Sequence, residues 1–142
     1  MKIAIYSQSS EKNTKKVMVE LLNLGKKYNI KFYVESNFHK LLENKLSFQP
    51  DYKIFSSYKD LDNSFDLMIT IGGDGTLLRS ISFIRNLEIP IIGINTGRLG
   101  FLATLNQDLL KPELNKILIG KYKVEKRTLL EVEIKGNEAI NE

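Results

Sequence analysis

The sequence predicts an α/β fold, with a mainly parallel sheet flanked by helices. Apolar runs typical of buried strands alternate with segments of helical periodicity. The run over residues 65–71 is nearly continuous, as expected for a central strand covered on both faces. It stops at the glycine-rich residues 72–76, after which helical spacing begins. This strand, helix, strand order favours parallel strands joined by right-handed crossovers.

The first half of the domain is predicted to contain two strands, each followed by a helix. Apolar runs predict strands at residues 2–6 and 30–34. The apolar residues between them recur at the spacing of one helical face: Val17, Leu21, Leu24 and Tyr28. A shorter helix is expected after Ser36. Residues 47–63 show no steady period, apart from a possible short strand at 53–55.

The second half repeats the alternation and then changes character. The spacing of Leu77, Leu78, Ile81 and Ile84 predicts a helix. A strand is expected at residues 89–94 and a further helix at 109–119, beginning near Pro112. Beyond Gly120 the β-forming residues lack a helical period. We therefore expect an α/β domain over residues 1–120 and, over 121–142, the first strands of a truncated β-rich domain.

Composition excludes several classes of protein. A chain of 142 residues fits one domain that buries roughly 70% of its unfolded surface. It has no cysteine, which rules out a disulfide framework and a Cys-ligated metal site. The N-terminal apolar run is too short for a signal peptide or a membrane span, so a soluble, cytoplasmic protein without a membrane partner is predicted. The net charge of +4 is spread along the chain, unlike the dense basic stripe of nucleic-acid binders.

The stretch GGDGT, residues 72–76, carries the clearest chemistry. Glycines between a strand and a helix allow backbone N–H groups to converge on a phosphate, and the helix dipole favours its negative charge. Asp74 is then unexpected, because an acid repels the ligand unless it holds a metal ion, accepts a proton or binds a hydroxyl. The alternatives are an ordinary tight turn and an N-capping Asp74. Neither G-x-x-x-x-G-K-[ST] nor G-x-G-x-x-G after a strand occurs.

These residues resemble a known family. GGDGT is similar to the signature of the superfamily that contains NAD kinases, diacylglycerol and sphingosine kinases and, more distantly, phosphofructokinases. A second loop at residues 95–102, NTGRLGFL, resembles the NAD kinase pattern, whereas lipid kinases are expected to show a P-x-G-T-x-N-D loop. Residues 139–142, AINE, resemble that family's A-L-N-E or A-L-N-D motif, with Ile for Leu. The motifs follow in the expected order along the chain.

The resemblance implies phosphorylation of NAD at the 2′-hydroxyl of its adenosine ribose, giving NADP. Asp74 would contact that hydroxyl as general base. The phosphates would be surrounded by Gly72, Gly73, Gly75 and Thr76. The donor would be ATP, or polyphosphate in some members, with Mg²⁺ or another divalent cation. Family members are typically homo-oligomers, which we expect of the full-length protein.

Six further residues are candidates for cofactor binding: Arg79, Asn95, Arg98, Phe101, Asn141 and Glu142. Phe101 would lie beside the adenine, or else pack into the core beneath the loop. Asn141 and Glu142 would hydrogen-bond NAD, Glu142 through ribose hydroxyls. Arg98 is either a ligand contact or a solvated charge, and Arg79 either reaches a phosphate or remains an exposed helix residue.

Two other functional classes stay open. A lipid or sugar kinase could use the same scaffold, and a nucleotide-binding module without catalysis could use the same turn. Family members continue into a β-rich domain and bind NAD between their two domains. The chain of 142 residues is therefore expected to be a fragment that is inactive alone.

Overall fold

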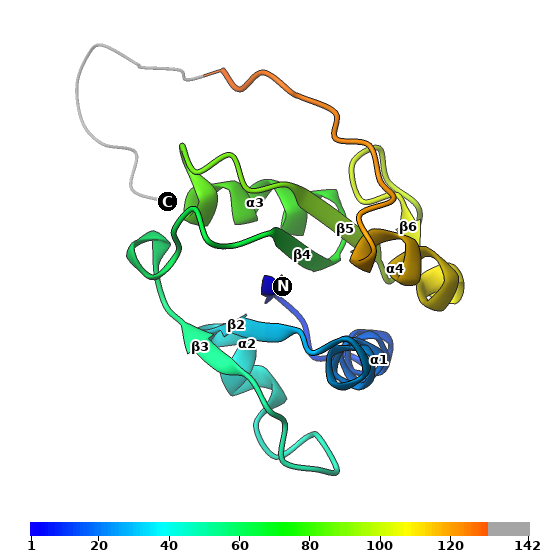
Figure 1. Cartoon of the computed structure of the whole chain (residues 1–142). Coiled ribbons are helices and arrows are strands. Elements are labelled where there is room, and N and C mark those ends of the chain that lie inside the picture. Colours follow the sequence, from blue (N-terminus) through cyan, green and yellow to red (C-terminus); the bar gives the residue numbers. More distant parts are fainter. Residues whose placement is uncertain (131–142) are drawn as a thin grey trace, which may run out of the picture.

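A computed structural model describes residues 1–130 of the chain. Its centre is a sheet of six parallel strands in the order β3-β2-β1-β4-β5-β6 (Figure 1). The strands are β1 (Lys2–Ser7), β2 (Lys31–Glu35), β3 (Lys53–Phe55), β4 (Leu67–Gly72), β5 (Ile91–Asn95) and β6 (Leu105–Asn106). The predicted parallel α/β fold is confirmed. Strand β6 was not predicted, because two residues are too few to show a pattern.

Four α-helices and two short 3-10 helices connect or follow the strands. They are α1 (Lys12–Tyr28), α2 (Ser36–Leu42), α3 (Asp74–Ile84), α4 (Leu110–Leu118), η1 (Tyr58–Asp60) and η2 (Gln107–Leu109). Each predicted α-helix is present. Pro112 lies in the first turn of α4, where its missing N–H costs no intrahelical hydrogen bond.

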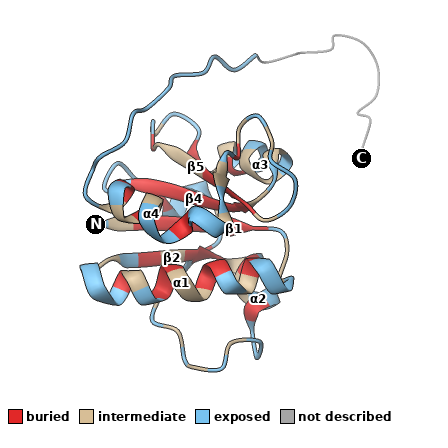
Figure 2. Cartoon of the chain, turned by 90° about the vertical axis from the view of Figure 1, so that its right-hand side faces the viewer, coloured by how far each residue is buried: buried red, intermediate tan, exposed pale blue. Residues whose placement is uncertain are grey.

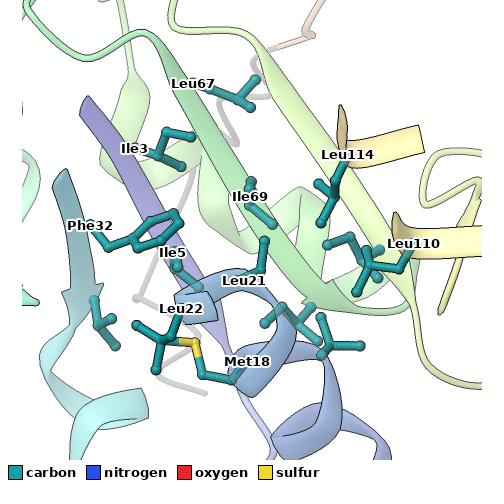
Figure 3. Packing of buried hydrophobic residues seen from close by; sticks show 14 of the residues in the cluster. Ile3, Ile5, Met18, Leu21, Leu22, Phe32, Leu67, Ile69, Leu110 and Leu114 are labelled. Carbon is teal, nitrogen blue, oxygen red and sulfur yellow. The ribbon is translucent and has the colours of Figure 1, made fainter. Parts of the chain in front are cut away.

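One face of the sheet packs against α1, α2 and α4. Figure 2 shows α1 and α4 side by side across the strands, with their buried residues toward the sheet. In Figure 3, Met18, Leu21 and Leu22 of α1 and Leu110 and Leu114 of α4 meet strand residues such as Ile5 and Ile69. The hydroxyl of Tyr28 also donates to Asn115 Oδ1 (2.8 Å), which links the two helices. Burying each such large side chain stabilises the fold by about 1.5–3 kcal/mol.

The opposite face packs against α3 and the segment around η1. Alternation along β1 directs Ala4 to this face while its neighbours face α1. Ala4 shares a second buried cluster with Met68 of β4 and Ile84 of α3. Leu78, predicted on the buried side of α3, is instead 51% exposed, because the helical period turns Ser80 and Ile84 inward. The sheet is thus covered on both faces, as the apolar run of β4 indicated.

The strand order places β1 beside β4. The chain runs outward through β1, β2 and β3, then returns to the other side of β1 and runs outward again through β4, β5 and β6. At the carboxyl ends of the two central strands, Ser7 pairs with Ile71. In open parallel sheets, ligands bind beyond the carboxyl ends of the strands at such a reversal of order. Residues 72–76 follow directly from this point.

Residues 121–130 form neither helix nor strand and are exposed. The division into an α/β domain and a truncated β-rich domain therefore stays a prediction. Asn141 and Glu142 lie outside the described residues. Within residues 1–130, no helix has the length and hydropathy needed to cross a bilayer.

Candidate functional site

The link between β4 and α3, residues 72–76, forms a turn that we call the glycine turn. Gly72 has a φ of +153°, and a Cβ there would lie 2.5 Å from Thr76 Oγ1, so no other residue fits. Gly73 is the N-cap of α3 and has no side chain to cap it. The first amide to find a helical acceptor is that of Leu77, which donates to Gly73 O (3.2 Å). The amides of the first turn before it therefore have no intrahelical partner.

The space above the glycine turn is open. A Cβ placed on Gly73 or on Gly75 would meet nothing within 4 Å. Packing within the described chain therefore does not explain these two glycines. Open space beside unpaired N–H groups and a helix N-terminus is the arrangement that binds phosphate.

Asp74 does not cap its helix. Its half-buried carboxylate accepts hydrogen bonds from three consecutive backbone amides of the loop between β5 and β6. Oδ2 accepts from Phe101 N (2.9 Å), and Oδ1 accepts from Leu102 N (3.0 Å) and Ala103 N (2.9 Å). We call this arrangement the Asp74–loop contact. The alternative of an N-capping Asp74 is wrong, because Gly73 occupies that position.

The Asp74–loop contact explains how an acid can sit in an anion-binding turn. The amides of Ala103, Phe101 and Leu102 hold the pKa of the Asp74 carboxyl below its usual range. The carboxylate is therefore ionised at neutral pH, and the three donors offset its charge. Sequence reasoning missed this, since backbone amides at a distance along the chain leave no residue pattern.

Asn95 organises the β5–β6 loop, residues 96–104. Its side chain is 4% exposed at the end of β5. Nδ2 donates to Arg98 O (2.7 Å) and Ala103 O (3.3 Å), and Oδ1 accepts from Gly97 N (2.8 Å). Both amide hydrogens of Asn95 are therefore used within the loop. Its role as a cofactor contact stays a prediction.

Two contacts fix the β5–β6 loop against the rest of the domain. Asn13, in the first turn of α1, donates from Nδ2 to Thr96 O (3.3 Å). At the other end of the loop, Ala103 is fully buried, and a Cβ on Gly93 of β5 would lie 2.7 Å from its Cα. Strand β5 thus needs glycine where Ala103 crosses it. Neither Asn13 nor Gly93 was among the predicted site residues.

The loop's larger side chains point away from the core. Phe101 is 94% exposed and Leu99 67%, and Arg98 is also exposed. The alternative in which Phe101 packs beneath the loop is therefore wrong. Arg79 lies exposed on the second turn of α3. The structure brings the glycine turn and the β5–β6 loop together, while contacts of Arg79, Arg98 and Phe101 with a ligand stay predictions.

A metal site made of protein side chains is not found in residues 1–130, where no group of three or more His, Asp or Glu residues could hold an ion. Asp74 offers a single carboxylate that already accepts three hydrogen bonds. These residues do not fit a metal ion held by the protein alone.

The strand order and the doubly covered sheet define an open, doubly wound α/β domain. The family model described as ATP-NAD kinase N-terminal domain matches residues 3–122. The chain belongs to the NAD kinase family.

Individual relatives agree with this assignment. The NAD kinase of Christiangramia forsetii is 47% identical over 130 residues, covering 92% of this chain and 44% of that protein. The NAD kinase of Flavobacterium psychrophilum is 44% identical over 130 residues, with the same coverage of both chains. The bifunctional NADP phosphatase/NAD kinase of Methanococcus maripaludis is 41% identical over 101 residues, covering 71% of this chain and 17% of that protein. The chain spans less than half the length of these relatives.

Solved structures share the fold. Yeast NADH kinase complexed with NADH superposes with a TM-score of 0.72 at 21% identity, covering 85% of this chain and 38% of that chain. An NAD kinase from Archaeoglobus fulgidus in complex with ATP has a TM-score of 0.51 at 21% identity, covering 83% and 37%.

Proposed function

We propose that the chain forms the nucleotide-binding α/β part of an NAD kinase. Such an enzyme transfers the terminal phosphoryl group of ATP to the 2′-hydroxyl of the adenosine ribose of NAD, giving NADP. The observation that carries the proposal is the Asp74–loop contact, which joins the GGDGT and NTGRLGFL motifs at one carboxylate. Membership of the NAD kinase family supports it, as do relatives of that name.

In this proposal GGDGT binds the phosphates and supplies Asp74, and the NTGRLGFL loop holds the Asp74 carboxylate in place. The open glycine turn receives phosphate groups at the N-terminus of α3. An ionised carboxylate has about four acceptor positions. Three are used by loop amides, two on Oδ1 and one on Oδ2, so one position on Oδ2 remains for the substrate hydroxyl. Asp74 thus orients that hydroxyl toward the phosphate.

The chemical step suits a carboxylate of lowered pKa. The hydroxyl oxygen of NAD forms a bond to the γ-phosphorus, the bond to the leaving ADP breaks, and the hydroxyl proton passes to Asp74. The transition state of phosphoryl transfer is loose, so alignment matters more than a strong base. Asp74 accepts the proton late, when the hydroxyl has become acidic. This order fits a carboxylate whose pKa is held down by three amides.

In this proposal the divalent ion is bound by the phosphates of ATP, the phosphoryl donor. Mg²⁺ is usually held by one or two carboxylates together with substrate phosphates. The described residues provide no cluster for it, so we propose that the ion arrives on the phosphates of ATP. Polyphosphate would carry the ion in the same way. Homo-oligomeric assembly and a cytoplasmic location stay predictions.

The test replaces Asp74 in a polypeptide that carries this chain and measures NADP formed from NAD and ATP. We expect Asp74→Asn to lower turnover by about 10²- to 10⁴-fold with little change in the KM for NAD. Asp66→Asn is the matched control, because Asp66 Oδ2 also accepts a backbone amide, from Lys2 N (2.7 Å), at the other end of β4. The proposal fails if Asp74→Asn turns over like wild type. It also fails if labelled ATP phosphorylates diacylglycerol or a sugar phosphate but not NAD.

A further inference from the structure

The β5–β6 loop meets the carboxylate of Asp74 at Gly100. A Cβ built on Gly100 would clash with Cγ and with both carboxylate oxygens of Asp74. The next three residues are the ones whose amides bind that carboxylate. No other glycine of the described chain lies against a charged group in this way.

We propose that Gly100 is a positioning residue for Asp74. Its missing side chain lets the loop bring three amides onto the carboxylate and leaves one acceptor position of Oδ2 for the substrate. The part of this inference that concerns catalysis rests on the proposed function. The part that concerns the Asp74–loop contact does not.

The loop is held on both sides of position 100. Its start is held by Asn95, which bonds to Gly97 and Arg98. Its end is held at Ala103, which is buried against Gly93. The carboxylate of Asp74 is the end of a side chain and can rotate away from an added methyl group. A side chain at position 100 therefore displaces the carboxylate and leaves the fold intact.

Displacing the carboxylate has a chemical cost. Hydrogen bonds from backbone amides to a carboxylate are charge-assisted and fix its orientation. Without them, Asp74 loses the geometry that directs Oδ2 toward the hydroxyl. A misplacement of about 1 Å at a reacting group can lower the rate by about 10²-fold.

Gly97 provides a matched control within the same loop. It lies three residues before Gly100, and a Cβ at that position would meet nothing within 4 Å. Its φ is outside the left-handed region. Gly97→Ala and Gly100→Ala thus add the same methyl group to one loop, but only the second meets Asp74.

The first measurement is amide hydrogen exchange, followed residue by residue by NMR in wild type, Gly100→Ala and Gly97→Ala. Phe101 is almost fully exposed, so its amide is protected only by its bond to Asp74. We expect the amides of residues 101–103 to exchange slowly in wild type and Gly97→Ala. In Gly100→Ala, the Phe101 amide should exchange at least 10-fold faster, with β4 unchanged as a check on folding. Rapid exchange of the Phe101 amide in wild type, or equal protection in Gly100→Ala, overturns the proposal.

The second measurement is the steady-state rate of NADP formation by the same variants in a polypeptide that carries this chain. We expect Gly100→Ala to lower kcat by about 10²-fold while the KM for NAD changes by less than about threefold. A KM that rises with kcat unchanged overturns the positioning role. If wild type forms no NADP, the proposed function fails, and hydrogen exchange still decides whether Gly100 permits the Asp74–loop contact.

Discussion

The carboxylate of Asp74 is surrounded by hydrogen-bond donors although it lies in a turn suited to binding anions. Three amides of the β5–β6 loop reach it within 3.0 Å. A carboxylate bound in this way stays ionised, and it links two parts of the chain separated by 27 to 29 residues. At the scale of single residues, Asp74 is thus both a structural acceptor and the candidate catalytic group.

The lowered pKa of Asp74 predicts a pH dependence of stability. In the unfolded chain an Asp titrates at about 3.9, and in the folded chain the amides hold the pKa lower. The folded state is therefore favoured by this group above about pH 3.9, and the stabilisation is lost as pH falls through the folded pKa. We expect urea midpoints of wild type and Asp74→Asn to differ most at pH 6 and to converge toward pH 3. Wild type must be compared with Asp74→Asn because Asp60 and Asp62 also have lowered pKa values and contribute to the pH dependence of both proteins.

Substitution of Phe101 is predicted to weaken NAD binding without changing the stability of the fold. Its side chain is almost fully exposed, so Phe101→Ala should leave the free energy of unfolding within about 0.5 kcal/mol of wild type. Stacking of an aromatic side chain on a base contributes about 1–3 kcal/mol, and we expect NAD to bind more weakly by about that amount. Titration calorimetry with NAD measures the change. Leu109→Ala, which also truncates an exposed apolar side chain, is the control and should bind NAD normally.

At the scale of elements, two strand ends and one helix build the site. Strand β4 leads through the glycine turn into α3, while the next strand, β5, leads into the loop that reaches back to the first residue of α3. The register of the sheet places Gly72 directly opposite Asn95. The two motifs therefore meet because their strands are neighbours. Hydrogen bonds from Asp74 and Asn95 then fix the loop.

Gly75 in the glycine turn is predicted to be needed for ligand binding and not for the stability of the fold. Gly75 lies in the first turn of α3, and a Cβ there would meet nothing within 4 Å. Ala is the better helix former, so Gly75→Ala should leave stability unchanged or raise it by up to about 1 kcal/mol.

The same methyl group would occupy the space left for phosphate, and we expect a KM for ATP at least 10-fold higher. Thermal unfolding and steady-state kinetics on one preparation separate the two effects. Gly97→Ala, in the other loop, is the control for adding a methyl group to an open glycine. An unchanged KM for ATP in Gly75→Ala would place the phosphates away from this turn.

At the scale of the whole molecule, the order of the strands decides where ligands can bind. The order in which strands are added to the sheet reverses between β1 and β4, which are themselves parallel, and the helices α1 and α3 that follow these strands lie on opposite faces of the sheet. Their N-termini thus both lie at the carboxyl ends of the strands, the edge at which open parallel sheets bind ligands. The hydrogen bond from Asn13 in the first turn of α1 to Thr96 in the β5–β6 loop crosses this region.

The placement of acidic and histidine side chains in the described residues predicts that a metal ion binds together with ATP. Residues 1–130 contain no cluster of acidic or histidine side chains that could hold an ion. We therefore expect Mg²⁺ to produce no binding heat with the chain alone and to be required once ATP is present. Chelation with EDTA should abolish NADP formation, and added Mg²⁺ should restore it. A tight Mg²⁺ site in the absence of ATP would contradict this expectation.

The sequence predicted the elements better than their contacts. Continuous apolar runs and helical spacing identified the longer strands and every α-helix, because burial on two faces or on one stripe leaves a periodic pattern. The order of the strands was not predicted, since neighbours in a parallel sheet are joined by long crossovers. Leu78 was misplaced because the inward face of α3 carries Ser80 beside Ile84, and a buried polar residue does not show in an apolar pattern.

Within the candidate site, the motif predicts Asp74 and the glycines as site residues, which stays a prediction, but it does not predict the partners of Asp74. Those partners are main-chain amides, which every residue except proline carries. The role of Gly100 was hidden for the same reason: it depends on a close approach that only the folded chain creates.

The bonds that shape the β5–β6 loop have a consequence for how ligand preference can evolve. Asn13, Asn95 and Asp74 recognise only main-chain atoms of this loop. The exposed side chains of Arg98, Leu99 and Phe101 make no contribution to these bonds. Mutations at these three positions can therefore accumulate without unfolding the domain, and selection can change what the loop contacts while its backbone stays the same.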